Sequence, residues 1–267
     1  VHMALSDANT VNIHQEAPAT KGRGGASVSN LDTTDTRLRD EGEIARGGMG
    51  AIHLVFDKAI LRHAAMKVLH DDAKLPPGSK ERFIEEARIT GQLEHPNIVP
   101  IYDLQLSPDG QPEHFTMKLV HGQTLSEVIK DCSTDQLAGR ALEKMLRIFL
   151  KVCEALSFAH SRSVVHRDLK PDNIMVGSHG QVYVMDWGIA LVTDQPIPEP
   201  PSTSNPHGSG RIRTQSDVST THGPTGVAGT PTFMAPEQTT GRLDDPDCRT
   251  DVYGLGGVLY AILTTKS

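Results

Sequence analysis

The chain of 267 residues has few cysteines, no long apolar run and no block of like charge. Its three cysteines are far apart and odd in number, which predicts neither a disulfide framework nor a zinc site and favours the reducing cytoplasm. No stretch approaches the roughly eighteen apolar residues that a membrane helix requires. A net charge of −7 without a basic tail gives no sign of a nucleic-acid or membrane partner.

Local composition divides the chain into a leader and two larger parts. Residues 1–35 are polar and rich in Ser, Thr, Asn and Gly, which predicts a disordered leader. Residues 36–120 predict a small, sheet-dominated lobe, with strands at 38–45, 51–56, 63–69, 98–106 and 114–120 and a helix at 80–93. From residue 121 onward the pattern becomes mainly helical, at 124–130, 141–160 and 251–264, with short strands at 174–176 and 182–185.

One stretch of eight residues concentrates the chemistry of the chain. Residues 166–173 read His-Arg-Asp-Leu-Lys-Pro-Asp-Asn, and Asp186-Trp187-Gly188 follows after twelve intervening residues. Phosphoryl transfer requires a carboxylate to orient the attacking hydroxyl, a cation near the transferred group, and an amide and a carboxylate to hold magnesium. A charged surface loop would very rarely contain these residue types in this order by chance.

The order H-R-D-L-x-x-x-N followed by D-x-G resembles the signature of protein kinases of the serine/threonine type, most similar to the bacterial, eukaryotic-like members. The resemblance covers residues 38–267 and implies an α+β, bilobal fold. A small antiparallel sheet with one helix (36–120) would precede a mainly helical second lobe (121–267). An activation segment at 186–237 would carry a mobile insert at 193–228, which is rich in Ser, Thr, Pro, Gly and His. The family domain continues beyond the last predicted helix, so the second lobe is expected to be truncated.

The resemblance assigns roles to the residues of the catalytic stretch. Asp168 would orient the substrate hydroxyl, and Lys170 would contact the transferred phosphoryl group, as in serine/threonine kinases. Asn173 and Asp186 would hold Mg²⁺, with Mn²⁺ as an alternative ion. Thr230, in a segment that resembles the substrate-positioning loop ending in A-P-E, would bridge Asp168 and Lys170. Trp187 stands where the family usually has phenylalanine, and we interpret it as a variant.

A glycine-rich segment between two predicted strands resembles the loop that covers the phosphates of ATP. Glycines let a backbone fold tightly and direct N–H groups at phosphate, although an ordinary hairpin turn is the commoner explanation of such a run. Ala45 departs from the family pattern, which has glycine at this position. The residues assigned to this part of the ATP site are Ile44, Ala45, Arg46, Gly47, Gly48, Met49, Gly50 and Ile52.

The strand that follows resembles the family's V-A-I-K strand, with Lys67 as the phosphate-binding cation. A lone strand lysine is usually a solvated charge, but Glu86 on the next helix is expected to pair with it, with Glu85 as the rival. The remaining expected ATP contacts are Ala65, Met117 at the back of the pocket, Val120 in the hinge and Met175 on the floor.

Arg167, just before Asp168, resembles the arginine of kinases that are switched by activation-loop phosphorylation. The candidate acceptors are Ser216, Ser219, Thr220, Thr221 and Thr225, of which Thr221 and Thr225 are preferred. The plain alternative is that any disordered linker is rich in Ser and Thr.

The leading hypothesis is therefore a kinase that transfers the γ-phosphate of ATP to Ser or Thr of proteins and phosphorylates its own activation loop. A kinase-like nucleotide-binding or scaffold module without turnover is the alternative, supported by the truncation, Ala45 and Trp187. A dinucleotide-binding oxidoreductase is excluded, because a strand with Lys67 follows the glycine run where a βαβ unit would be required.

Overall fold

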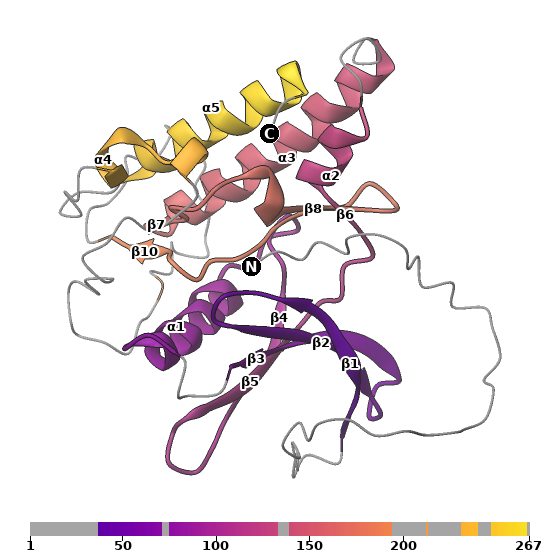
Figure 1. Ribbon diagram of the computed structural model, residues 1–267, viewed down its shortest axis with the longest axis vertical. Coiled ribbons are helices and arrows are strands. Elements are labelled where there is room, and N and C mark those ends of the chain that lie inside the picture. The colour runs from indigo at the N-terminus through magenta and orange to yellow at the C-terminus, as the bar shows by residue number, and fades with distance from the viewer. Residues whose placement is uncertain are drawn as a thin grey trace, which may run out of the picture.

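The computed structural model describes residues 37–70, 75–132, 139–193, 212, 231–239 and 247–265. These residues form a small lobe dominated by one sheet and a larger, mostly helical lobe, as Figure 1 shows. The expected leader lies outside the described residues, and so does the expected insert apart from Thr193 and Ile212.

Five antiparallel strands form the sheet of the small lobe, in the order β1-β2-β3-β5-β4. One helix, α1 (Ser79–Gln92), contacts β4 and β5 (Figure 1). The strands are β1 (Leu38–Arg46), β2 (Gly50–Asp57), β3 (Arg62–Leu69), β4 (Ile101–Leu106) and β5 (Pro112–Met117).

The sequence explains where α1 lies and which side it buries. The helix begins after Gly78, whose φ of 76° is in the left-handed region that favours glycine. Phe83, Glu86, Ala87 and Thr90 recur at helical spacing and are buried. Glu86 is therefore on the face turned to the sheet, whereas Glu85 is only half-buried.

Two strand predictions were wrong at one end. The strand expected at 98–106 begins at Ile101, because Ile98 forms a parallel bridge with Val184 of the large lobe and Pro100 has no N–H to donate. The strand expected at 114–120 ends at Met117, where the chain leaves the sheet to enter the other lobe.

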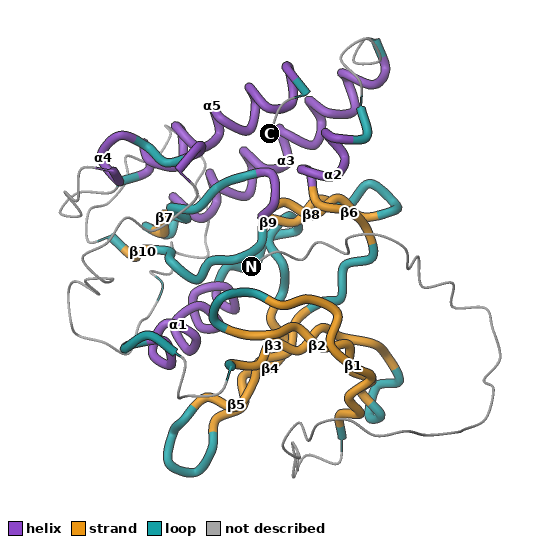
Figure 2. Tube along the Cα trace, viewed as in Figure 1, coloured by secondary structure: helices purple, strands orange, loops and turns teal. Residues whose placement is uncertain are grey.

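Helices form most of the large lobe, and Figure 2 shows them on one side of its short strands. The predicted helices at 124–130, 141–160 and 251–264 are confirmed with small shifts as α2 (Leu125–Lys130), α3 (Arg140–Ser161) and α5 (Cys248–Thr264). The shorter elements are β6 (Gly122–Thr124), β7 (Val164–Val165), η3 (Pro171–Asn173), β8 (Ile174–Gly177), β9 (Val182–Val184), β10 (Leu191–Val192), η4 (Pro231–Phe233) and α4 (Pro236–Thr239).

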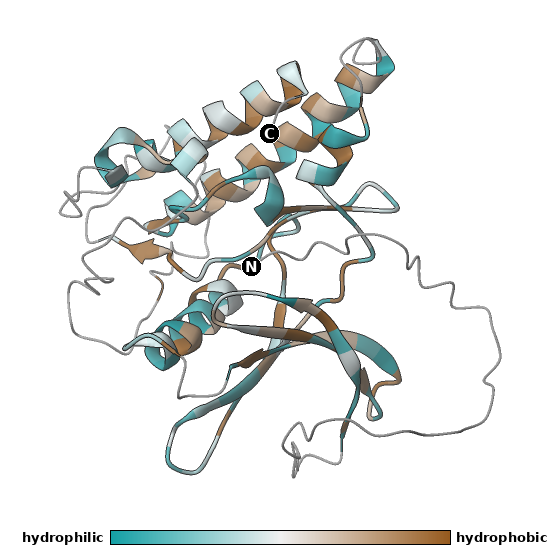
Figure 3. Cartoon of the chain, in the orientation of Figure 1, coloured by the Kyte–Doolittle hydropathy of each residue, from teal (hydrophilic) through white to brown (hydrophobic). Residues whose placement is uncertain are grey.

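A hydrophobic core fills the large lobe. Ile148 and Val152 of α3 belong to the same buried cluster as Val258 and Ile262 of α5. Figure 3 shows that both helices carry apolar residues among polar ones, as amphipathic helices do. No helix among the described residues is both long and apolar enough to cross a bilayer.

A second cluster joins the two lobes. Ile52 and Met117 of the small lobe share it with Met175 and Met185 of the large lobe. Backbone contacts reinforce this junction, because the N–H of Val184 donates to the carbonyl of Asn97 at 2.8 Å. The two lobes are therefore held together beside the segments that carry the predicted site.

The turn between β1 and β2 generates a stability prediction. A Cβ at Gly50 would overlap the carbonyl oxygen of Val68, whereas a Cβ at Gly48 would meet nothing within 4 Å. Gly50→Ala is expected to lower the free energy of unfolding by about 1–3 kcal/mol, because the strand backbone must shift. Gly48→Ala, the matched control, should stay within about 0.5 kcal/mol of the parent in denaturant titrations. Equal losses in the two variants would contradict the close approach.

Candidate active site

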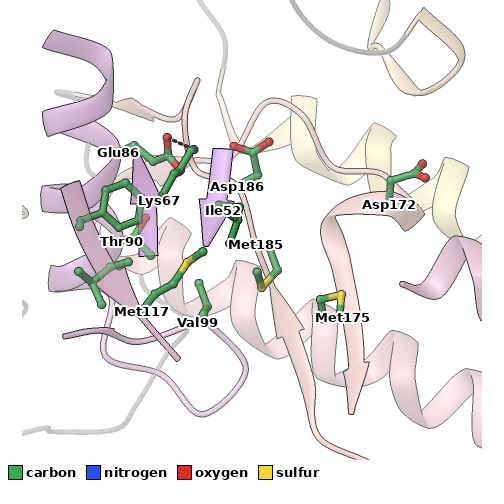
Figure 4. Close-up of a pocket in the computed structure, with 12 residues that line it drawn as sticks. Ile52, Lys67, Glu86, Thr90, Val99, Met117, Asp172, Met175, Met185 and Asp186 are labelled. Atoms are coloured by element: carbon green, nitrogen blue, oxygen red, sulfur yellow. Dashed lines mark hydrogen bonds and ion pairs between the residues drawn. The ribbon is translucent and has the colours of Figure 1, made fainter. Parts of the chain in front are cut away.

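A pocket lies between the two lobes. The small lobe contributes side chains from β2, β3, β5 and α1, and the large lobe contributes Asp172, Met175, Met185 and Asp186, as Figure 4 shows. Six predicted ATP- or metal-site residues line it, namely Ile52, Lys67, Glu86, Met117, Met175 and Asp186. Six further lining residues were not predicted, namely Thr90, Val99, Ile101, Phe115, Asp172 and Met185.

Helix and strand periodicity could have predicted two of the pocket residues that were missed. Thr90 follows Glu86 by four positions on α1, and residues four apart lie on one helix face. Phe115 precedes Met117 by two positions on β5, and residues two apart lie on one face of a strand. Each could have been inferred from its predicted neighbour.

Residues 44–50 of the glycine-rich segment and three other predicted residues lie around the pocket without lining it. Ala65 and Val120 belong to the hydrophobic cluster that joins the lobes, and Ile44 and Ala45 pack against that cluster. The exposed Arg46 pairs with Glu43. Gly47, Gly48 and Met49 form the turn between β1 and β2, and Gly50 begins β2. Asn173 lies beside Asp168.

A buried ion pair connects the sheet to α1. Lys67 Nζ donates to Glu86 Oε1 at 2.6 Å and to Oε2 at 2.7 Å, and the two side chains are 3% and 8% exposed. Of the two glutamates considered, Glu86 is thus the partner of Lys67. Burial opposes the charged form of Lys67, but the carboxylates of Glu86 and Asp186 outweigh it and raise the pKa of Lys67. Burial raises the pKa of Glu86, and Lys67 partly offsets this effect.

Asp186 completes the charged end of the pocket, and Figure 4 shows it next to the Lys67–Glu86 pair. Burial alone would raise the pKa of its carboxyl group. The Lys67 ammonium is the strongest opposing influence, and the pKa lies below the ordinary value. The φ of Asp186 is 61°, which is rare for a residue other than glycine. Such strained backbone persists where the surroundings enforce it, typically at functional sites.

Asp168, Lys170 and Asn173 form one hydrogen-bonded group. Lys170 Nζ donates to Asp168 Oδ2 at 2.8 Å, and Asn173 Nδ2 donates to the same oxygen at 3.1 Å and to the Asp168 carbonyl at 2.8 Å. Among the described residues, the buried Oδ1 of Asn173 has no hydrogen-bond partner. A buried acceptor without a donor is costly, and a bound cation would satisfy it. The residues present therefore fit a magnesium site.

The catalytic stretch is fixed through its backbone by Asp251 of α5. Asp251 Oδ2 accepts from the N–H of His166 at 2.8 Å and lies 2.7 Å from His160 Nε2, while Oδ1 accepts from the N–H of Arg167 at 2.8 Å. The ring of His166 is fully buried, with Nε2 3.0 Å from the carbonyl of Met185. His166 is therefore a packing residue, and it ties this stretch to the segment that carries Asp186.

Arg167 and Trp187 are two buried groups beside this network. Arg167 Nε and Trp187 Nε1 have no hydrogen-bond partner among the described residues. Burial lowers the pKa of the Arg167 guanidinium, although Asp251 acts in the opposite direction. The indole of Trp187 packs edge-on against His166, with ring centroids 4.6 Å apart. An aromatic residue therefore fills the position where the family has phenylalanine.

Some predicted residues cannot be placed. Thr230, Thr221 and Thr225 lie outside the described residues, as do Ser216, Ser219 and Thr220. Their proposed roles stay predictions.

The Asp251 network generates a second stability prediction. Asp251→Ala removes the acceptor of two backbone N–H groups and of the His160 contact, all at a residue 1% exposed. The free energy of unfolding is expected to fall by about 3–5 kcal/mol, as when one partner of a buried polar network is removed. Glu143→Ala, which removes an exposed pair with Arg147 on α3, should cost about 0.5 kcal/mol or less. Similar losses in both variants on urea denaturation would contradict the central role of Asp251.

Comparison with known proteins agrees with this geometry. The family described as protein kinase domain matches residues 38–267. The chain is 38% identical over 231 residues to serine/threonine-protein kinase PknD of Protochlamydia amoebophila, which covers 84% of this chain and 22% of the relative. It is 36% identical over 227 residues to PknD of Chlamydia muridarum, which covers 83% of this chain and 24% of the relative. The chain thus spans about a quarter of the length of these relatives, and it belongs to the protein kinase family.

Proposed function

We propose that this chain is a serine/threonine protein kinase, which transfers the γ-phosphate of ATP to Ser or Thr hydroxyl groups of proteins. The observation that carries the proposal is the assembly of Lys67, Glu86 and Asp186 at one end of an apolar pocket, with Asp168 and Asn173 tied together nearby. The relatives named serine/threonine-protein kinase support the same activity. The proposed compartment is the cytoplasm.

The pocket offers separate surfaces for the two ends of ATP. Ile52, Met117 and Met175 supply an apolar surface suited to the adenine ring. Lys67 is held charged by two carboxylates, so it can attract phosphate oxygens while Glu86 fixes its direction. An acidic chain can therefore bind a polyanion, because the cation is local and oriented.

The metal would be held by Asn173 and Asp186. The buried Asn173 Oδ1 has no hydrogen-bond partner among the described residues, and the lowered pKa of Asp186 keeps its carboxylate ionised. Mg²⁺ prefers such oxygen ligands and commonly takes others from phosphates and water. When bound, Mg²⁺ or Mn²⁺ supplies positive charge that neutralises the phosphates.

Asp168 is positioned to orient the attacking hydroxyl. Lys170 and Asn173 both donate to its Oδ2, which fixes the direction of the carboxylate that would accept a hydrogen bond from a substrate hydroxyl. The hydroxyl oxygen would form a bond to the γ-phosphorus as the bond to the bridging oxygen of ADP breaks, and Asp168 would take the proton. Lys170 would offset charge on the transferred group.

A kinase-like module that binds nucleotide without turnover is the second candidate. Trp187 favours it, because its buried indole N–H has no hydrogen-bond partner among the described residues, and an unsatisfied buried donor next to Asp186 costs free energy. Nucleotide binding without phosphate transfer would distinguish this candidate from the enzyme.

Labelling with radioactive ATP and magnesium tests the proposal. Asp168→Asn is expected to lower phosphate transfer at least about 100-fold, because it removes the base. Lys67→Met should lower transfer comparably, since it removes the phosphate-binding cation, and chelation of magnesium should abolish transfer. Glu85→Gln, which alters the neighbour of Glu86, is the control that should keep parental activity. Thermal denaturation verifies that each variant folds. Equal labelling of the parent, Asp168→Asn and Lys67→Met would contradict the roles assigned to Asp168 and Lys67.

The proposed autophosphorylation has its own test. After incubation with magnesium and ATP, mass spectrometry should find phosphate between residues 193 and 228, with Thr221 or Thr225 as the preferred sites. A phosphate there could pair with Arg167, whose buried Nε has no partner among the described residues. Phosphate found only outside this segment, or in equal amount on Asp168→Asn, would overturn the prediction.

A further inference from the structure

A histidine directly after β3 holds the backbone of the glycine-rich turn. His70 Nε2 lies 2.8 Å from the carbonyl oxygen of Gly47, and the backbone N–H of His70 donates to the carbonyl of Met49 at 3.1 Å. One residue thus contacts two carbonyls of the turn, once through its ring and once through its backbone. The ring contact depends on the histidine side chain, whereas any residue other than proline at this position could make the backbone contact.

The direction of the ring hydrogen bond is settled by chemistry. A carbonyl oxygen can only accept, so the proton must be on Nε2 of His70, which donates. The ring is partly buried, which limits competition from water. The contact therefore acts as a tether between the end of β3 and the turn.

Fixing the Gly47 carbonyl also fixes the next N–H group. In a trans peptide the C=O of one residue and the N–H of the following residue point in opposite directions within one plane. The Gly47 carbonyl points to His70, so the Gly48 N–H must point away from His70. Gly47 N donates to the Gly50 carbonyl at 2.8 Å and closes the turn.

Without the tether the Gly47–Gly48 peptide would rotate easily. Both residues are glycines, which restrict their backbone angles less than any other residue. A Cβ at Gly48 would meet nothing within 4 Å, so there is open space on the side-chain side of Gly48. The ring of His70 is thus the contact that selects one orientation of the peptide.

We propose that His70 is a positioning residue, which orients the Gly47–Gly48 peptide so that the Gly48 N–H is presented to a phosphate of ATP. The inference rests on the proposed function and deepens it. Lys67 lies on β3 and His70 follows directly after this strand, so one short stretch of chain would set both the phosphate-binding cation and the phosphate-binding amide.

The test compares His70→Leu, which removes the donor, with His70→Gln, whose amide N–H has a similar reach. His53→Leu is the matched control, because His53 on β2 contacts Asp40 on the exposed face of the sheet. Binding of magnesium–ATP and of adenosine is measured by calorimetry for all four proteins. Adenosine has no phosphate, so it separates loss of phosphate contacts from general damage to the pocket.

His70→Leu is expected to weaken ATP binding about threefold to tenfold, the effect of losing one ordinary hydrogen bond, and to leave adenosine binding within about twofold. His70→Gln and His53→Leu should bind ATP within about twofold of the parent. Unchanged ATP affinity in His70→Leu, or an equal loss for adenosine, would overturn the role of His70 alone. Failure of the parent to bind either compound would overturn the proposed function.

Hydrogen exchange in the absence of nucleotide tests the tether independently. Amides of residues 44–52 should exchange several-fold faster in His70→Leu than in the parent, and at the parental rate in His70→Gln and His53→Leu. Unchanged exchange in His70→Leu would overturn the tether whatever the nucleotide affinities are.

Discussion

The buried ion pair between Lys67 and Glu86 is the constraint on which the small lobe depends. Two charges removed from water are tolerated only while each has its partner, and removal of either leaves an uncompensated charge that costs several kcal/mol. The pair therefore fixes the distance between β3 and α1. Because Thr90 and Phe115 line the space beside it, the same constraint keeps the back of the pocket in shape.

The large lobe stabilises a loop without regular secondary structure, residues 166–170. Asp251 accepts from consecutive backbone N–H groups, and His166 contacts the segment that carries Asp186. Gly254 of α5 allows close packing, since a Cβ there would lie 3.1 Å from the Cβ of Leu169. The loop is thus supported by a helix whose own position is set by the hydrophobic core.

The sequence predicted best what depends on local pattern or on a fixed chemical order. Helix α3 was predicted because its apolar residues recur at helical spacing. Asp168 and Asn173 were selected because their spacing is part of a motif, and the structure brings the two side chains into hydrogen-bond contact, while their roles stay predictions. The start of β4 was wrong because the partner of Ile98 is Val184, 86 positions away, which no local window contains. Asp172 was missed because nothing in its neighbourhood shows that it turns to the pocket. Contacts between the lobes join residues far apart in the sequence, and the local periodicity of apolar residues does not predict them.

Trp187 gives the chain a built-in optical reporter. It is the only tryptophan, it is 1% exposed, and it is bonded directly to Asp186. Fluorescence excited in the indole band therefore arises from one position, next to a proposed metal ligand. Any rearrangement of that segment would alter the emission of a single, label-free chromophore.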